Sequence, residues 1–414
     1  MSDVTEGARP HEDMGPLFRR EAAKLLAALT RALGVHSLPL AEDVVQDALI
    51  RALETWKVHG VPENPGAWLM RVAKNRAIDV VRRDRRSASL DELAEPAEEL
   101  VPAPDDELRM MFSCCHPKVP AEAQIALILS VLSGFGVSEI AAAFLAKESA
   151  VEKRLARAKA ALAETKHLFD FAKEDISSRL ETVQRALYLL FNEGYHGANE
   201  ESAVRTELCR EAMHLVSLLR QNSITATPST HALAGLMCFH AARLAARVDP
   251  AGELVALVDQ DRSKWDRALV MEGEYLLNLS ARGDELSEFH LEAAIAHVHL
   301  SAPSAADTQW SVIVGLYDRL LAIRPSPVIS LNRAIAVAQA EGPERGREAL
   351  LSIPGRERLE TYPFYAAALG EIELRCGNAT AAHEHYRTAI ALARSPMERR
   401  FLQTRAVRSL PIDA

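Results

Sequence analysis

Residues 64–86 read NPGAWLMRVAKNRAIDVVRRDRR, and this stretch predicts a helix that begins near Ala67. Arg71, Asn75 and Arg82 fall on one side of that helix because residues three or four apart share a helical face. Seven Lys or Arg side chains stand against two Asp side chains in the stretch. A cationic helix that carries an amide on the same face suits contact with a phosphate backbone and with base edges.

Two shorter amphipathic helices precede this basic helix. The first spans about 17–33 and carries Leu at three- and four-residue spacing, which predicts one apolar face. The second spans about 40–56 and begins with Glu42 and Asp43, whose carboxylates suit the positive end of a helix dipole. Two prolines and two glycines within residues 58–66 predict the end of that helix and a loop.

An acidic segment separates these helices from a second helical cluster. Residues 89–107 hold eight Asp or Glu and no Lys or Arg, and this composition predicts a flexible linker. The last two helices of the second cluster, about 137–145 and 149–166, are separated by a short break, and the second of them is basic. Ser149 and Glu152 are spaced as in a capping box. The pair predicts a helix-turn-helix unit.

The remaining chain, from about residue 175, predicts a series of helices rich in Ala and Leu. Near its end, Gly370, Gly377, Ala382 and Tyr386 match the spacing of a tetratricopeptide unit. In such a unit small residues let two antiparallel helices approach, and an aromatic ring fills the gap. Only this last unit matches well, and it predicts a helical-repeat tail.

Composition indicates the class of protein. Of the 414 residues, 48% are hydrophobic, 25% charged and only 5% aromatic, which favours a globular, all-α chain of several domains. No apolar run approaches the ~20 residues of a membrane span, and the polar first residues argue against a secretion signal. Five Cys do not indicate a disulfide framework, so we expect a cytoplasmic protein. The net charge of -9 averages over basic and acidic segments and does not exclude a nucleic-acid partner.

The first two helical clusters carry three motifs in order. These are AEDVVQDALIRALETW at 41–56, NPGAWLMRVAKNRAIDVVRR at 64–83, and VSEIAAAFL at 137–145 followed by VEKRLARAK at 151–159. The motifs resemble, in turn, the core-binding helix, the promoter-melting and -10 recognition helix, and the -35 helix-turn-helix of bacterial RNA polymerase sigma factors of the extracytoplasmic-function (ECF) type.

The tail resembles one branch of that family. The segments that carry the resemblance are YLLFNEGY at 188–195, DQDRSKW at 259–265, AAIAHVH at 293–299 and SPVISLNRAIA at 326–336. Members of this branch have a C-terminal tetratricopeptide-like extension, which is thought to take over the regulation that a separate anti-sigma protein gives other members.

The resemblance implies four parts: a region-2 domain at 11–87, an acidic flexible linker at 88–105, a region-4 helix-turn-helix domain at 106–173, and a regulatory or interaction domain at 174–414. It implies a sigma factor that binds core RNA polymerase and directs promoter recognition, with its activity modulated by the tail. The implied partners are core polymerase, promoter DNA in double- and single-stranded form, and a protein partner or signal at the repeats. No catalytic residue, cofactor, metal or membrane is implied.

The resemblance also assigns residues to three surfaces. On the core-binding helix, unpaired acids and an amide beside an exposed Leu suit an interface with an apolar anchor and a polar rim. On the -10 helix, cations follow phosphates while the loop at 58–65 captures a flipped base. On the -35 helix, two Arg suit base contact and a Lys suits phosphate contact. The sets are Asp43, Gln46, Asp47 and Leu53 for polymerase; Arg71, Lys74, Asn75, Arg82 and Arg83 for the -10 element; and Ser149, Lys153, Arg154 and Arg157 for the -35 element.

Other interpretations of these motifs remain open. Cys114-Cys115-His116 lacks the spacing of zinc ligands, so we expect small buried thiols there. A polymerase-independent helix-turn-helix repressor fits the second cluster, but it needs no melting helix. A catalytic tail would rely on Glu193 or Asp261, whereas hydrogen bonding between helices explains the polar residues around them without any nucleophile and base pair.

Overall fold

The computed structural model describes residues 14–34, 37–87, 105–144, 146–164, 173–196, 204–393 and 396–407. These residues form α-helices and short 3-10 turns, and the described part contains no strand, which confirms the all-α prediction. The predicted acidic linker at 88–105 lies outside the described residues except at its last position. The chain divides into two compact units, 1–186 and 187–414.

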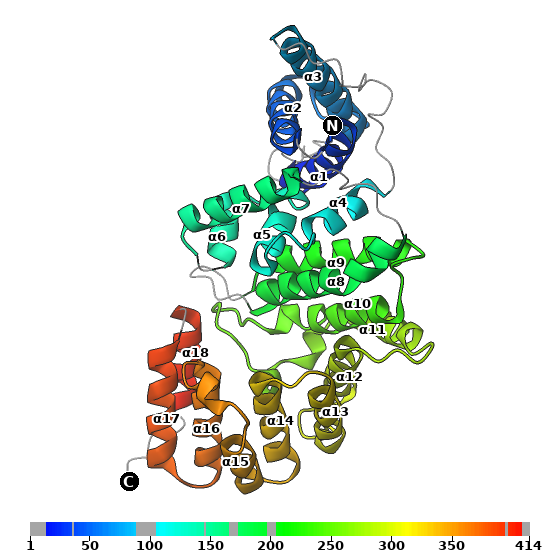
Figure 1. Cartoon of the computed structure of the whole chain (residues 1–414). Helices are drawn as coiled ribbons and strands as arrows, with labels where there is room; N and C mark the ends of the chain where they lie inside the picture. Colours follow the sequence, from blue (N-terminus) through cyan, green and yellow to red (C-terminus); the bar gives the residue numbers. More distant parts are fainter. Residues whose placement is uncertain are drawn as a thin grey trace, which may run out of the picture. The chain divides into compact units, whose positions relative to one another are not determined.

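The first unit holds two groups of helices, drawn in blue to green in Figure 1. The first group is α1 to α3 and the second is α4 to α7, and the first half of α8 completes the unit. Their bounds are α1 (Met14–Leu33), α2 (Leu38–His59), α3 (Pro65–Ser87), α4 (Asp106–Cys114), α5 (Ala121–Val131), α6 (Val137–Ala143), α7 (Glu148–Ala163) and α8 (Lys173–His196).

The first group packs around an aromatic centre. Trp56 of α2 is 5% exposed; its ring stacks on Phe18 of α1 at 5.3 Å and meets Trp68 of α3 edge-on at 5.4 Å. Leu29 of α1 and Ala48 of α2 are fully buried, as the apolar spacing that predicted these helices requires. Burying one large apolar side chain contributes about 1.5–3 kcal/mol, so this centre fixes α3 against α2.

The helix-turn-helix of the second group forms as predicted, but its second helix begins differently. Helix α7 starts at Glu148, and its N-cap is Lys147, which makes no side-chain capping bond. Ser149 therefore lies inside the first turn, and the predicted capping box is wrong. The predicted apolar face is confirmed, because Val151, Leu155 and Ala158 of α7 are at most 5% exposed.

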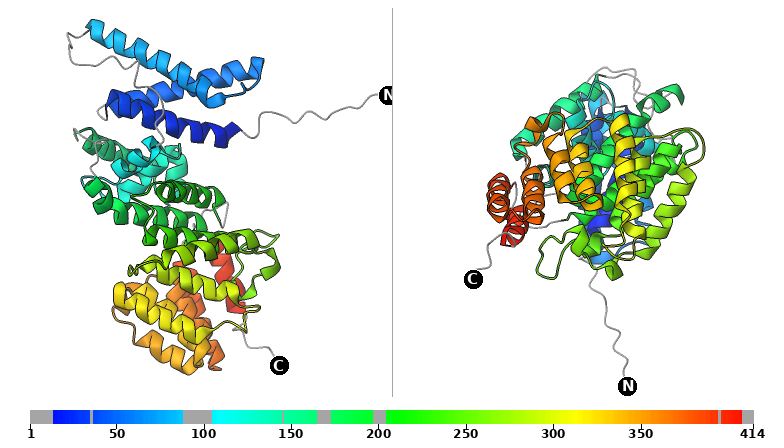
Figure 2. Two further views of the ribbon diagram at one scale, coloured as in Figure 1. Left: turned by 90° about the vertical axis from the view of Figure 1, so that its right-hand side faces the viewer. Right: turned by 90° about the horizontal axis from the view of Figure 1, so that it is seen from below.

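The second unit is a succession of helix pairs, which Figures 1 and 2 show in green to red. Neighbouring helices pack pairwise, most extensively α10 with α11 and α16 with α17. The bounds are α9 (Thr206–Gln221), α10 (Pro228–Ala241), α11 (Arg267–Ser280), α12 (Glu288–Ser301), α13 (Trp310–Ile323), α14 (Pro327–Ala340), α15 (Pro343–Leu351), α16 (Pro363–Arg375), α17 (Ala379–Leu392) and α18 (Pro396–Val407).

The last of these pairs shows why small residues recur in the tail. A Cβ added at Gly370 of α16 would lie 3.0 Å from the ring of Tyr386, and that ring is 2% exposed on α17. Gly377 has φ of 84° in the turn between the two helices, a conformation that favours glycine. The close approach of this pair agrees with the predicted spacing, and the tetratricopeptide assignment stays a prediction.

Candidate nucleic-acid and polymerase interfaces

The residues predicted to bind polymerase lie together on the exposed face of α2. Asp43, Gln46 and Asp47 are exposed, and Leu53 is 40% exposed. The other face of the helix, which includes Ala41 and Val44, is buried. Acids and an amide surround apolar side chains that have no intramolecular core to join, which is the composition of a binding face.

Sequence reasoning missed one member of this face and one contact. Ile50 of α2 is 48% exposed, and its spacing of three and four residues from Gln46, Asp47 and Leu53 is the signal that identifies it. The expectation of unpaired acids is wrong for Asp47, because Arg76 Nε of α3 donates to its Oδ2 at 2.7 Å. Both side chains remain more than a third exposed, and such a surface pair contributes ~1 kcal/mol or less.

The basic helix α3 presents part of its predicted set. Arg71 and Asn75 are exposed, and Lys74 is half-buried. Arg71 and Lys74 line a cavity of about 630 Å³ beside the start of α3. The side chains of Arg82 and Arg83 lie outside the described residues, although both positions belong to the helix.

The loop before α3 is short and partly apolar. Helix α2 ends at His59, Gly60 turns the chain with φ of 79°, and α3 begins at Pro65. The Asn64 side chain accepts a hydrogen bond from Ala67 N–H at 3.0 Å, which caps the first turn of α3. Val58 next to this loop is 77% exposed, so an apolar side chain borders the place where a flipped base is expected.

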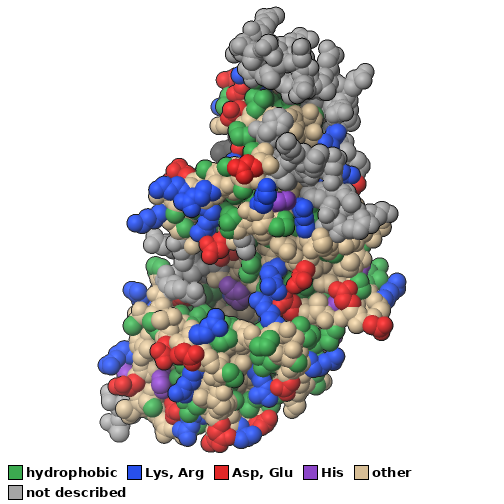
Figure 3. Space-filling view, viewed as in Figure 1, with side chains coloured by type: hydrophobic (Ala, Val, Ile, Leu, Met, Phe, Trp, Pro, Cys, Tyr) green, Lys and Arg blue, Asp and Glu red, His purple; other side chains and the backbone are tan. Residues whose placement is uncertain are grey.

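The predicted -35 residues lie on the outer face of α7. Ser149, Lys153 and Arg157 are exposed, and Arg154 is half-buried. Figure 3 shows Lys and Arg side chains gathered over α6 and α7. Arg154 pairs with Glu122 of α5 at 3.3 Å, and that carboxylate is 83% exposed. A shallow groove of about 380 Å³ lies between α5 and this face.

One further ion pair joins the two helix groups of the first unit. Lys159 Nζ of α7 donates to both carboxylate oxygens of Glu42 of α2, at 2.6 and 2.7 Å. Both side chains are less than a third exposed. The pair connects the helix expected to read DNA with the helix expected to bind polymerase, and no sequence signal links positions so far apart in the chain.

The cysteines predicted to be buried thiols are buried. Cys114 is fully buried and Cys115 is 1% exposed at the end of α4. Burial raises the pKa of both thiols, that of Cys115 to about 12. The described residues contain no cluster of three His, Cys, Asp or Glu that suits a metal ion.

The polar residues considered for catalysis have structural contacts. Asp261 accepts hydrogen bonds from the backbone N–H and the hydroxyl of Ser263 at 3.0 and 2.7 Å, and these bonds lower its pKa. Arg262 donates to the carbonyls of His299 and Ala302 at 2.8 and 2.6 Å. Arg262 thus holds the end of α12, as the hydrogen-bonding interpretation predicted.

Comparison with known families identifies the first unit. Residues 17–87 match the model of Sigma-70 region 2, and residues 109–162 match that of Sigma-70, region 4. The chain belongs to the sigma-70 family of RNA polymerase sigma factors. It is an ECF-like member with a C-terminal extension, in which residues 179–281 match a family of unknown function, DUF6596. The sigma factor therefore directs promoter recognition through contacts with core RNA polymerase and promoter DNA.

The extension is shared with a full-length relative. An uncharacterized protein of Rhizobium meliloti (strain 1021) is 38% identical over 398 residues, which cover 92% of this sigma factor and 93% of the relative. No solved structure matches the chain. Among the described helices, none combines the length and apolar character that a membrane span requires.

Proposed function

We propose that α2 of this sigma factor binds core polymerase through Asp43, Gln46, Asp47 and Leu53. The observation that carries this proposal is the shared exposed face of these four residues on the region-2 helix, with Ile50 exposed between them. Apolar side chains at the centre and acids at the rim give both anchoring and orientation. Pairing with Arg76 holds the Asp47 carboxylate in place at little cost to its exposure.

The two DNA-binding surfaces divide the promoter between them. We assign Arg71, Lys74, Asn75, Arg82 and Arg83 of α3 to the -10 element and its melted strand, and Ser149, Lys153, Arg154 and Arg157 of α7 to the -35 element. Exposed Arg side chains suit guanine edges, and Lys suits phosphates. In this assignment the exchange of Glu122 for DNA frees the Arg154 guanidinium, since that ion pair is long and its carboxylate exposed.

The C-terminal extension modulates the activity of the first unit in this proposal. Paired helices of the kind seen in the second unit form extended surfaces for protein partners. In this proposal the extension contributes no covalent chemistry, and the hydrogen bonds in which Asp261 and Arg262 are engaged support that assignment. We place the region-2 part at 11–87, the region-4 part at 106–173 and the extension at 174–414.

Run-off transcription with purified core polymerase tests the proposal. We expect core-dependent transcripts from promoter-bearing genomic fragments with the full chain, and few transcripts with the Gln46→Ala/Asp47→Ala variant. A chain truncated after Ala186 keeps the whole first unit and shows how the extension acts. Equal transcription and equal regulation by the truncated and full chains would eliminate the modulatory role, and transcripts that do not depend on core polymerase would eliminate the polymerase assignment.

A further inference from the structure

A cavity of about 520 Å³ lies within the second unit, and none of the residues assigned to polymerase or promoter DNA lines it. Five helices contribute to its wall, namely α8, α10, α12, α13 and α14, together with the chain just after α10. Its volume is in the range of sites that hold small organic molecules. Part of the wall is apolar, with Leu257, Ile295 and Leu320, and the remainder is polar.

Arg243 is the unusual member of the polar wall. It follows the end of α10, is only 6% exposed, and lines the cavity. Its Nη2 donates to Nδ1 of His240 at 2.7 Å, and its guanidinium lies 5.8 Å from the centre of the Tyr195 ring. Its Nε has no hydrogen-bond partner. Among the described residues no carboxylate lies within ion-pair distance of it, so a permanent positive charge is buried without a counter-charge.

The imidazoles around Arg243 do not supply that counter-charge. His240 and His299 also line the cavity. Burial and the nearby Arg243 lower the pKa of both rings, that of His299 to about 4. Both rings are therefore neutral at neutral pH and offer hydrogen bonds instead of charge. Burial and the charge of Arg243 also lower the pKa of Arg262, and Asp307 opposes that shift.

The acids on the cavity wall and close to it have other partners. Tyr188 Oη donates to Oε2 of Glu292 at 2.6 Å. Burial raises the pKa of Glu292 to about 7, so this carboxyl is only partly ionised at neutral pH. Arg324 Nη1 donates to Glu288 at 2.5 Å. Neither carboxyl thus neutralises Arg243, which leaves its positive charge on the cavity wall.

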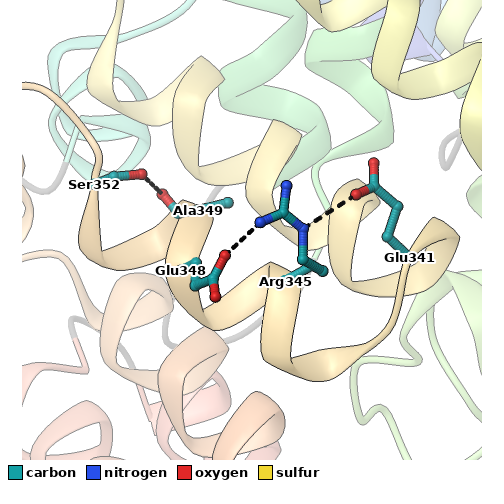
Figure 4. Close-up of polar contacts among 5 residues, drawn as sticks. All are labelled: Glu341, Arg345, Glu348, Ala349 and Ser352. Carbon is teal, nitrogen blue, oxygen red and sulfur yellow. Dashed lines mark hydrogen bonds and ion pairs between the residues drawn. The ribbon is translucent and has the colours of Figure 1, made fainter.

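Arg345 of α15 shows the ordinary condition of an arginine in the same unit. Figure 4 shows its guanidinium between two carboxylates, Glu341 and Glu348, at 3.5 and 2.5 Å. Arg345 is 62% exposed and still has two acidic partners. Arg243 is buried and has none, and the space next to it is open.

We propose that this cavity binds a small organic anion whose carboxylate or phosphate group pairs with the Arg243 guanidinium. The guanidinium donors match two oxygens of a carboxylate or a phosphate. Either group also supplies the negative charge that Arg243 lacks, which a neutral ligand does not. The neutral imidazoles donate or accept further hydrogen bonds, and the apolar wall covers the carbon skeleton. The site goes beyond the sigma activity, because binding at this cavity needs neither polymerase nor DNA.

Two probes test the proposal on the full chain. Succinate presents carboxylates and glycerol 3-phosphate presents a phosphate monoester, and each is titrated at constant ionic strength while the thermal unfolding midpoint and the heat of binding are recorded. We expect at least one probe to raise the midpoint with saturation. The Arg243→Met variant should bind that probe at least tenfold more weakly. The Arg345→Met variant removes an exposed arginine and should bind as the natural chain does.

The outcomes separate the anion classes. Saturation by only one probe identifies a carboxylate or a phosphate as the recognised group. If Arg243→Met fails to fold by circular dichroism, Arg243→Lys keeps the charge without the planar fork and should still bind at least fivefold more weakly. Absence of saturable binding with both probes, or equal binding by the natural chain and the Arg243 variants, overturns the proposal.

Discussion

Helix α7 of the first unit and the cavity of the second unit hold their cations in opposite ways. On α7, Lys153 and Arg157 are exposed, whereas Arg243 at the cavity is buried without an acidic partner among the described residues. Exposed cations bind a polyanion by releasing its counterions, so their affinity depends strongly on salt and weakly on ligand shape. A buried cation selects a ligand that fits the space beside it. The position of a positive charge, more than its presence, separates a DNA-binding surface from a pocket for a small anion.

The largest effect is expected at the acidic face of α2, in the same unit as the exposed cations of α7. Replacement of Gln46 and Asp47 by Ala should weaken core binding about 30-fold, since two polar side chains that each lose a hydrogen bond across the interface cost ~1 kcal/mol or more apiece. Binding to labelled core polymerase measures the loss. The Asp284→Ala variant removes an exposed acid from the turn between α11 and α12 and should bind core unchanged. Unchanged binding by the double variant would remove α2 from the interface.

The next effect concerns the exposed cations themselves. The Arg157→Ala variant should bind promoter DNA, as holoenzyme, about tenfold more weakly, because a bidentate contact to a base contributes ~1–3 kcal/mol. The Lys153→Ala variant should lose affinity for all sequences alike and reduce the salt dependence by about one counterion. Fluorescence anisotropy at several salt concentrations distinguishes the two. As a control, Arg319→Ala removes an exposed Arg of α13 and should have no effect.

The third effect concerns the stability of the second unit, which a substitution of glycine by alanine should lower without any change of charge. A Cβ added at Gly194 of α8 would lie 2.8 Å from the Arg205 carbonyl oxygen and from the Cys209 nitrogen. Because backbone atoms cannot move aside cheaply, Gly194→Ala should destabilise the unit by ~1–3 kcal/mol. Chemical denaturation followed by circular dichroism measures this loss.

The matched control for that change is Gly315→Ala in α13. A Cβ there would meet nothing within 4 Å, and Ala is favoured over Gly inside a helix by up to ~1 kcal/mol. This variant should therefore be slightly more stable than the natural chain. If both glycine variants behave alike, close approach between α8 and the chain at 205–209 does not limit stability.

The smallest effect is a pH dependence at the cavity wall. Burial raises the pKa of Glu292 from 4.5 to about 7, with Glu288 adding to the shift and Tyr188 opposing it. Between these two pH values the folded state binds a proton that the unfolded state does not, so this residue's contribution to stability falls as pH rises and is constant above pH 7. The Glu292→Gln variant lacks this loss.

Thermal unfolding at pH 5 and pH 8 measures the effect of that substitution. We expect the free energy of unfolding of the Glu292→Gln variant, relative to the natural chain, to be higher at pH 8 than at pH 5 by an amount on the order of 1 kcal/mol, which raises its relative midpoint at pH 8. Comparison of the two chains at each pH cancels the titration of the cavity histidines, which acts in the opposite direction. A pH-independent difference would contradict the raised pKa.

The helices of the first unit could be predicted from sequence because their signals are local. The predicted helix at 40–56 became α2 (Leu38–His59) with its apolar face buried as expected. The sequence-based predictions were wrong where a helix boundary depends on a single residue, or where a side chain's partner lies on another helix. The start of α7 moved ahead of Ser149, and Asp47 gained the partner Arg76 from the next helix. Spacing along one helix carries no information about either.

The cavity of the second unit could not be predicted for a related reason. Its polar residues come from positions between 188 and 332, on several helices and on the chain between them. The sequence around each residue alone does not indicate a site. Tyr188 and Glu292 meet only because α8 and α12 each place one residue at the same point. An unpaired buried Arg becomes visible only when every neighbouring acid has been located, which requires the fold.

The burial of the cysteines has a practical consequence for reagents that attack thiols. Four of the five thiols are buried, and only Cys376, just after α16, is partly accessible. Burial raises the pKa of all five thiols, so few thiolates are present at any of them, and accessibility decides which thiol reacts first with maleimides or peroxides. A maleimide dye under brief, mild conditions should therefore attach at Cys376 first. The natural chain thus offers a single attachment point in its extension, from which distances to a labelled polymerase can be followed during initiation.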